Sequence, residues 1–294
     1  MDRFEAGFEV AEDQAVQVGP TVLRLLVGLE LRRYREAAGT SREAAGYAIR
    51  GSASKMSRLE AGRSSFKARD ITDLLSLYGV TAEADLRALL GLAEAANQPA
   101  WWYPYADLVP TWFEPYLGFE QDAGVIRGYE VQVIPGLLQT EDYARGVIEV
   151  GCDTEIDRRV ELRMKRQELI HRPNPPSVWV VIDEAALRRP YGGTATMRRQ
   201  LQHLIEVSEL PQVTIQIMPF SRGGHAATGG PIALLRLPQP QLPDIVYLEQ
   251  LTSGLYPDRP SDLDQYWHIM NRLATEAAPA ADTAAILHDI VRQI

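Results

Sequence analysis

The sequence predicts an all-α head of five helices followed by an α+β C-terminal domain of mixed α/β character. Apolar residues recur at helical spacing over residues 21–92, and from residue 123 onward this pattern gives way to alternating strand-like and helix-like segments. The chain has 294 residues, of which 46% are hydrophobic. This length exceeds one typical domain, and the composition supplies enough apolar surface for two cores.

The helices of the head follow from apolar spacing and from residues that begin or end helices. The first is expected over 21–38, where one apolar stripe recurs. A second is expected over 42–49, because Ser41 is a suitable N-cap and small residues allow close packing. Two later apolar segments, 71–78 and 86–92, predict the helices that close the bundle.

The third helix is the most informative feature of the chain. It follows a short turn at 50–52, begins with Ser52 or Ser54 as N-cap, and directs Met56 and Leu59 toward the core. Its outward-facing residues are Ala53, Ser54, Lys55, Ser57 and Arg58. A helix with such a face, preceded by a helix and a turn, is typical of a helix-turn-helix that enters the major groove of DNA.

Charge supports contact between the head and double-stranded DNA. Residues 24–69 contain 11 Lys and Arg against 4 Glu, whereas the whole chain has a net charge of −9. Phosphate contacts supply most of the non-specific affinity for DNA. Base-edge contacts are expected from Ala53, Ser54, Ser57 and Arg58, and phosphate contacts from Arg42, Lys55 and Arg63. Arg58 is the best candidate for a bidentate contact to guanine.

Two regions resemble a known family. Segments 31–45, 52–63 and 74–80 resemble the Xre-type helix-turn-helix of actinomycete regulators. Segment 129–144, which contains the run Pro-Gly-Leu-Leu-Gln-Thr-Glu-Asp-Tyr-Ala, resembles the start of the second domain in the WhiJ/Scr1-like, antitoxin-like branch. The resemblance implies a developmental or antitoxin-like transcription factor, often paired with a small partner protein.

The same resemblance assigns a structural pair in the head. Arg35 and Glu60 match the positions of an Arg–Glu bridge between the first and third helices of phage-repressor-like heads, so both are expected to position the reading helix. The alternative is that Glu60 accepts a hydrogen bond from a cytosine amine, but its neighbour Leu59 turns this part of the helix inward.

Composition divides the chain into four parts. Residues 1–19 form an acidic arm that we expect to be disordered, 20–97 the Xre-type helix-turn-helix domain, 98–122 an aromatic connector, and 123–294 an α+β regulatory or interaction domain. The connector holds 8 of the 23 aromatic residues. Their rings either dock the connector onto both domains or wall a ligand cavity.

The C-terminal domain alternates strands and helices. Strands are expected at 125–134, 177–182, 213–218, 232–237 and 245–249, and helices at 140–149, 157–171, 196–210, 261–277 and 283–292. The Arg-rich helix over 157–171 is interpreted as a solvated surface helix, with a second DNA contact as the alternative. The Gly-rich segment 221–230 lacks the Gly-Lys-Ser/Thr ending of a phosphate loop and is interpreted as a mobile hairpin connection.

One motif of this domain has two interpretations. Pro135 and Gly136 end the first strand and Thr140 caps the following helix, so the segment between them predicts a strand-to-helix corner. The functional alternative makes Leu137, Leu138 and Gln139 part of a regulatory site, because α/β domains often bind ligands at the carboxyl ends of strands.

The sequence predicts no catalytic residue, no metal site and no cofactor. Its five histidines lack metal-ligand spacing, and Asp183 and Glu184, which follow a strand, are expected to cap the next helix. One cysteine excludes an intramolecular disulfide, and the absence of a long apolar segment predicts a cytoplasmic, nucleoid-associated protein without membrane contact.

We therefore expect a sequence-specific transcriptional regulator whose C-terminal domain receives a signal. One head reads only a few base pairs, so a homodimer on a palindromic operator is expected. The signal is either a small partner protein, bound as in an antitoxin-like interaction protein, or a small-molecule effector that repositions the head.

Overall fold

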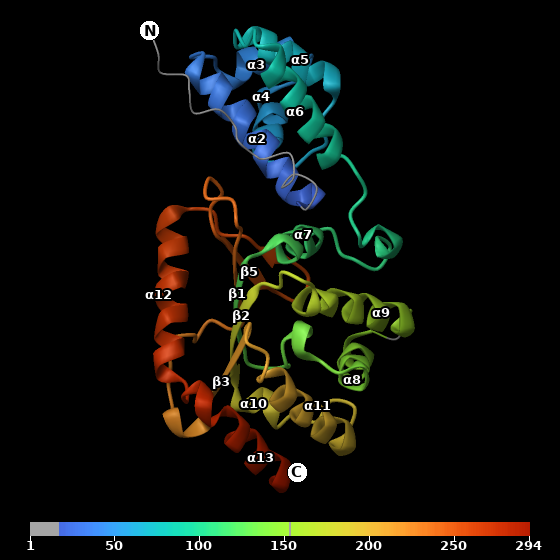
Figure 1. Cartoon of the computed structure of the whole chain (residues 1–294), viewed down its shortest axis with the longest axis vertical. Coiled ribbons are helices and arrows are strands. Elements are labelled where there is room, and N and C mark those ends of the chain that lie inside the picture. Colours follow the sequence, from blue (N-terminus) through green and yellow to red (C-terminus); the bar gives the residue numbers. More distant parts are fainter. Residues whose placement is uncertain (1–17, 153) are drawn as a thin grey trace. The chain divides into compact units, whose positions relative to one another are not determined.

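The computed structural model describes residues 18–152 and 154–294 and divides into two compact units between Tyr103 and Pro104 (Figure 1). The first unit is helical and the second contains a mixed six-stranded sheet, which confirms the predicted fold class. The division falls inside the aromatic stretch 98–122. The acidic arm expected over 1–19 lies outside the described residues, except for Val18 and Gly19.

Five α-helices form the described part of the first unit: α2 (Pro20–Ala37), α3 (Arg42–Ala48), α4 (Ala53–Glu60), α5 (Ala68–Leu77) and α6 (Glu83–Ala96). Serine side chains begin the two helices of the predicted helix-turn-helix. The hydroxyl of Ser41 accepts from the amide of Ala44 at 3.2 Å, and that of Ser52 accepts from the amide of Lys55 at 3.2 Å. These caps satisfy amides that have no partner within the helix, which fixes where α3 and α4 begin.

Helix α4 lies very close to α2 and α3 because glycine occurs at both contacts. A Cβ atom on Gly28 would approach the carbonyl oxygen of Leu59 to 2.6 Å, and one on Gly46 would approach that of Ser52 to 2.7 Å. Met56 and Leu59 are buried, as predicted. The inner face of α4 is therefore fixed by backbone contact as well as by apolar packing.

The sheet of the second unit consists of β1 (Val125–Glu130), β2 (Ser177–Asp183), β3 (Val213–Met218), β4 (Ile232–Arg236), β5 (Ile245–Glu249) and β6 (Gly254–Leu255). Their order is β3-β2-β1-β4-β5-β6. The first three strands pair in parallel and the remaining pairs are antiparallel. The carboxyl ends of β1, β2 and β3 therefore lie at one edge of the sheet.

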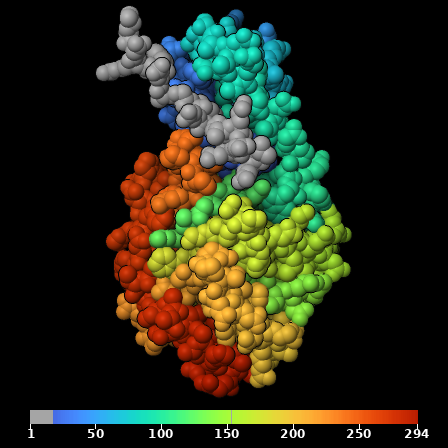
Figure 2. Space-filling view, viewed as in Figure 1, coloured from blue at the N-terminus to red at the C-terminus, as the bar shows by residue number. Residues whose placement is uncertain are grey.

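Helices cover both faces of this sheet. They are α7 (Glu114–Asp122), α8 (Glu141–Gly151), α9 (Ile156–Gln167), α10 (Glu184–Leu187), α11 (Thr194–Val207), α12 (Pro260–Glu276) and α13 (Thr283–Gln293). Within this unit α12 lies on one face, whereas α8, α9 and α11 lie on the other (Figure 1). Residues of the C-terminal helix α13 form part of the unit's surface (Figure 2). The core between the sheet and α12 includes Tyr129, Val181, Met218, Leu234, Val246, Met270 and Leu273.

Two predictions for this unit were wrong in detail. The segment 221–230 does not connect a hairpin, because β3 and β4 are separated in the sheet by β2 and β1. The first strand ends at Glu130 rather than at residue 134, and a 3-10 helix, η2 (Gly136–Leu138), precedes α8. The sequence pattern also gave no sign of α7, which lies within the predicted connector.

Candidate nucleic-acid interface

The predicted reading helix α4 has one exposed and one fixed face. Ser54, Ser57 and Arg58 are exposed, whereas Ala53 and Lys55 are partly buried. The exposed residues include three of the four for which base-edge contacts were predicted. This face consists of two hydroxyls and one guanidinium, groups that donate to or accept from base edges in a major groove.

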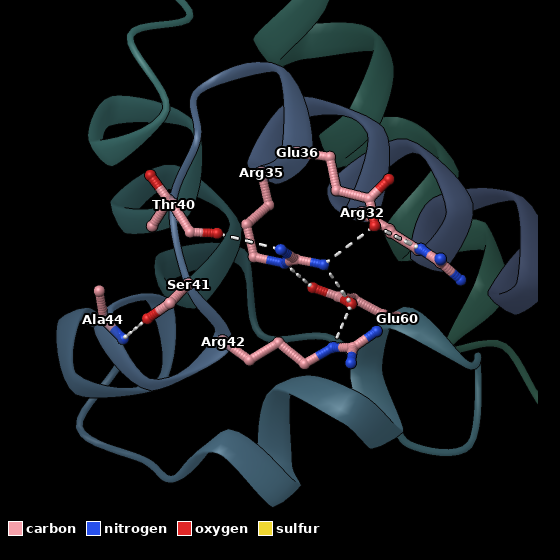
Figure 3. A network of polar contacts seen from close by, with 8 residues as sticks. All are labelled: Arg32, Arg35, Glu36, Thr40, Ser41, Arg42, Ala44 and Glu60. Atoms are coloured by element: carbon pink, nitrogen blue, oxygen red, sulfur yellow. Dashed lines mark hydrogen bonds and ion pairs between the residues drawn. The ribbon is translucent and has the colours of Figure 1, made fainter.

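The structure brings Arg35 and Glu60 together in a buried ion pair (Figure 3). Two guanidinium nitrogens of Arg35 donate to the two carboxylate oxygens of Glu60, and the Nη2 contact measures 3.1 Å. The Glu60 side chain is only 2% exposed. The hydrogen bond from the guanidinium to Glu60 raises the pKa of Arg35, against the effect of burial.

Arg42, predicted as a phosphate contact, belongs to the same network. Its Nε donates to Oε2 of Glu60 at 2.9 Å, although 41% of its side chain remains exposed (Figure 3). Arg35 also donates to the carbonyl oxygen of Thr40 at 3.0 Å, which ties the loop before α3 to the same carboxylate. Glu60 therefore connects α4 to both α2 and α3.

Lys55, the second predicted phosphate contact, is held by a carboxylate of α5. Its Nζ lies 2.6 Å from Oδ2 of Asp70, whose side chain is 4% exposed. Burial favours the neutral acid, but the hydrogen bond and charge of Lys55 together lower the pKa of Asp70 below its ordinary value. This pair fixes the first turn of α4 to α5.

Among the described residues of the head, three exposed cations form no ion pair: Arg58, Arg63 and Lys67. Arg63 and Lys67 lie in the loop between α4 and α5. Asn97 anchors this loop through two hydrogen bonds to the backbone of Phe66, at 3.1 and 2.7 Å. The loop that directly follows α4 therefore carries these two exposed cations on a backbone anchored by Asn97.

In the second unit, Leu137, Leu138 and Gln139 are all buried. The side-chain amide of Gln139 donates to the carbonyl oxygen of Ile134 at 2.7 Å and accepts from Nη1 of Arg163 at 2.8 Å. Gln200 closes the segment by donating to the carbonyl of Leu138 and accepting from the amide of Thr140. This geometry favours the interpretation of the motif as a strand-to-helix corner.

The Arg-rich helix α9 turns two arginines inward, which corrects its interpretation as a solvated helix. Arg166 forms a two-point ion pair with Glu120 of α7, at 2.9 and 2.8 Å, and both side chains are buried. Burial and the neighbouring Arg166 lower the pKa of Arg163 to about 10. The sequence contains no local signal for this pairing, because Glu120 lies far from α9 along the chain.

A carboxylate at the end of β1 belongs to the same polar cluster. Burial, with a smaller contribution from the charge of Glu249, raises the pKa of Glu130 to about 8. The charges of Arg163 and Arg166 lower the pKa of Glu130, by less than burial raises it. Within the described part of the chain, neither Glu130 nor Arg163 has an ion-pair partner within 4.0 Å. We call Glu120, Glu130, Arg163 and Arg166, which are buried or partly buried, the buried polar cluster.

The carboxyl ends of β1 and β2 meet around Asp183. As predicted, Asp183 caps a helix, because its Oδ1 accepts from the amide of Ala185 at 2.9 Å. Its Oδ2 accepts from the hydroxyl of Tyr129 at 3.2 Å, and that hydroxyl also lies 3.1 Å from Nε2 of His225. Among residues 18–152 and 154–294, no group of three His, Cys, Asp or Glu is placed to hold a metal ion.

A five-helix head with a buttressed α4, followed by a separate mixed-sheet unit, defines a two-domain protein of the helix-turn-helix class. Residues 26–90 match the model of a helix-turn-helix domain, and residues 113–289 match the domain of unknown function DUF5753. The second match covers more than half of the chain, so this protein belongs to the DUF5753 family. Among curated proteins and solved structures, none matches the sequence.

The helix-turn-helix match identifies DNA as the expected partner of the head, while the DUF5753 description assigns no role to the second unit. No helix among the described residues is long and apolar enough to cross a membrane.

Proposed function

We propose that this protein is a sequence-specific DNA-binding transcriptional regulator, in which the head reads the operator and the second unit receives a regulatory signal. The observation that carries the proposal is the division of α4 into two faces. Glu60 and Lys55 tie the helix to the rest of the head, whereas Ser54, Ser57 and Arg58 are exposed. Base readout in a major groove requires such a fixed helix with polar groups directed outward.

The distribution of cations supports the same proposal. Arg42 and Lys55 keep partial exposure but are held by internal carboxylates, so their main role is to position α4. Arg58, Arg63 and Lys67 are exposed without such partners among the described residues. Phosphates would supply the counter-charges that these three cations lack, and Arg and Lys make most phosphate contacts in protein–DNA complexes.

The proposal includes the oligomeric state of the protein and the group of regulators to which it belongs. The head of one chain contacts only a few base pairs, so we place the protein on a palindromic operator as a homodimer. The likeness of the head to Xre-type regulators, and of segment 129–144 to the antitoxin-like branch, supports membership of that group. In this proposal neither unit is an enzyme.

Two versions of the signal remain, a small molecule and a small partner protein. The buried polar cluster favours the small molecule, because Glu130 and Arg163 are partly buried ionisable groups without ion-pair partners in the described chain. A ligand that carries both a cationic and an anionic group would pair with both of them. The antitoxin-like likeness alone supports the partner protein.

The test of the proposal is selection of bound duplexes from a random DNA pool by the purified full-length chain. Titration of the selected duplex at several salt concentrations, together with light scattering, completes the measurement. We expect one palindromic motif, a linear fall of log affinity with log salt, and two chains on each duplex. Equal retention of all sequences would contradict sequence-specific readout, and retention of none would contradict DNA binding.

A further inference from the structure

Four helices of the head end in the same hydrogen-bonded motif. At the ends of α2, α3, α4 and α5, an amide donates to the carbonyl oxygen five residues earlier, at 3.0, 2.8, 2.8 and 2.9 Å respectively. This Schellman motif places one residue, directly after the C-cap, in the left-handed region of backbone conformation. Glycine occupies that position in three of the four motifs, as Gly39, Gly62 and Gly79, with φ of 62°, 66° and 77°.

The exception lies in the turn of the helix-turn-helix itself. At the end of α3 the left-handed residue is Arg50, with φ of 54°, although Gly51 is the next residue. A residue other than glycine is strained in this backbone conformation, because its Cβ atom crowds the following carbonyl oxygen. A Cβ on Gly51 would meet Cδ of Lys55 at 2.6 Å, a contact that the flexible lysine side chain could relieve. An arginine therefore occupies a position where glycine would be the unstrained choice.

Among the described residues of the head, the Arg50 side chain makes only an exposed ion pair. Nη1 of Arg50 lies 3.1 Å from Oδ2 of Asp73, but 65% of the Arg50 side chain is exposed, and such surface pairs contribute little to stability. Tyr47, whose carbonyl oxygen accepts from the amide of Arg50 at 3.0 Å, is 86% exposed. The end of α3 thus carries an arginine with a strained backbone and a tyrosine whose side chain is exposed to solvent.

We propose that Tyr47 and Arg50 form a phosphate-contacting patch that holds the DNA backbone beside the groove entered by α4. This inference rests on the proposed DNA binding of the head. Arginine and tyrosine side chains are among those that contact phosphate oxygens and position a protein on the duplex. The patch immediately precedes Ser52, the N-cap of α4, so it lies next to the end of the helix that reads base edges. Strain retained at a position whose side chain makes only an exposed ion pair is typical of a functional site.

The test separates strain from contact by substituting Arg50→Gly in the full-length chain. Glycine removes both the strain and the guanidinium, so the melting temperature should stay the same or rise by a few degrees. Affinity should fall several-fold on every duplex alike, and the salt slope should decrease by about one unit. Arg50→Lys keeps the strain and the charge, and should keep the slope. Tyr47→Phe should weaken binding without changing the slope.

Two control variants change a charge while keeping Arg50: Arg87→Ala lowers the net charge by one, as Arg50→Gly does, and Asp73→Asn raises it by one. Arg87→Ala removes an exposed cation of α6 that pairs with Glu83, and should leave affinity unchanged. Asp73→Asn releases Arg50 from its surface pair, and should leave affinity equal or higher. Arg50→Gly protein with wild-type affinity and slope, or with a clearly lower melting temperature, would overturn the inference. Altered transcription from the operator with unchanged DNA affinity would also overturn it, in favour of a protein contact. A wild-type chain that binds no DNA overturns the proposed function and this inference together.

Discussion

Arg35 and Glu60 join α2 to the last turn of α4 through a two-point ion pair that is buried on both sides. The same carboxylate accepts from Arg42 of α3, so one acidic side chain orients three helices of the head. Removing one partner from a buried pair leaves the other charge uncompensated, which costs more than the pair itself contributes. We therefore expect Glu60 to affect DNA recognition through the position of α4.

The first prediction concerns this carboxylate. Glu60→Gln should lower the free energy of unfolding by about 3–5 kcal/mol, because it leaves the buried Arg35 with only the exposed Glu36 as a counter-charge. Thermal and denaturant melts of the full-length chain measure the loss. The control is Glu36→Gln, which removes an exposed carboxylate bound to the same arginine and should change stability little. Unchanged stability of Glu60→Gln with an altered base preference would show that Glu60 reads a base.

A second prediction separates base readout from phosphate binding. Arg58→Ala should relax specificity at one base pair, with a loss of about 1–3 kcal/mol on the preferred duplex. Arg63→Ala should weaken all sequences alike and lower the salt slope by about one unit. Both side chains are exposed, so neither variant should alter the melting temperature. An Arg58→Ala protein with the wild-type base preference would contradict the assignment of α4 as the reading helix.

Local sequence signals predicted most of the fold. Ser41 and Ser52 are caps that act on amides three residues away, and the apolar spacing of each helix lies within one segment. Local signals could not predict the order of the strands in the sheet, because that order depends on contacts between distant segments. A Gly-rich stretch between two apolar runs indicates a hairpin locally, yet β2 and β1 separate β3 from β4.

The candidate site shows the same division between local and distant contacts. Exposure of Ser54, Ser57 and Arg58 follows from helical periodicity, and the sequence predicted it. The engagement of Lys55 depends on Asp70 in another helix, and no spacing rule within α4 indicates that pair. Arg50 was also missed, since its left-handed conformation is evident only when the hydrogen bonds at the end of α3 are known.

The third prediction concerns pH and Glu130. Its pKa in the folded protein, about 8, lies above the ordinary value of a glutamate, so the folded state holds a proton that the unfolded chain has released. Between the ordinary glutamate pKa and about pH 8, the contribution of Glu130 to stability therefore falls as pH rises, and it levels off above that value. Glu130→Gln should gain stability over the wild type across this window. A difference in stability between the two proteins that stays the same at every pH would contradict the buried position of Glu130.

The last prediction tests the corner at Gln139. Its amide links the carbonyl of Ile134 to the guanidinium of Arg163, and the backbone oxygen of Gln139 accepts from Gln167 at 2.7 Å. Gln139→Ala should cost about 1–3 kcal/mol, because it leaves polar groups inside the unit without partners. Gln139→Glu keeps an acceptor for Arg163 and should recover part of that loss in a denaturant titration.

The same two variants distinguish a corner from a regulatory site. If Gln139 only supports the corner, response to the signal in a reporter assay should follow stability, with Gln139→Glu closer to the wild type than Gln139→Ala. DNA affinity of both proteins should stay at the wild-type value wherever they are folded, since the hydrogen bonds of Gln139 to Ile134, Arg163 and Gln167 all lie within the second unit. A Gln139→Ala protein with wild-type stability and a lost response would instead assign Gln139 to the site that receives the signal.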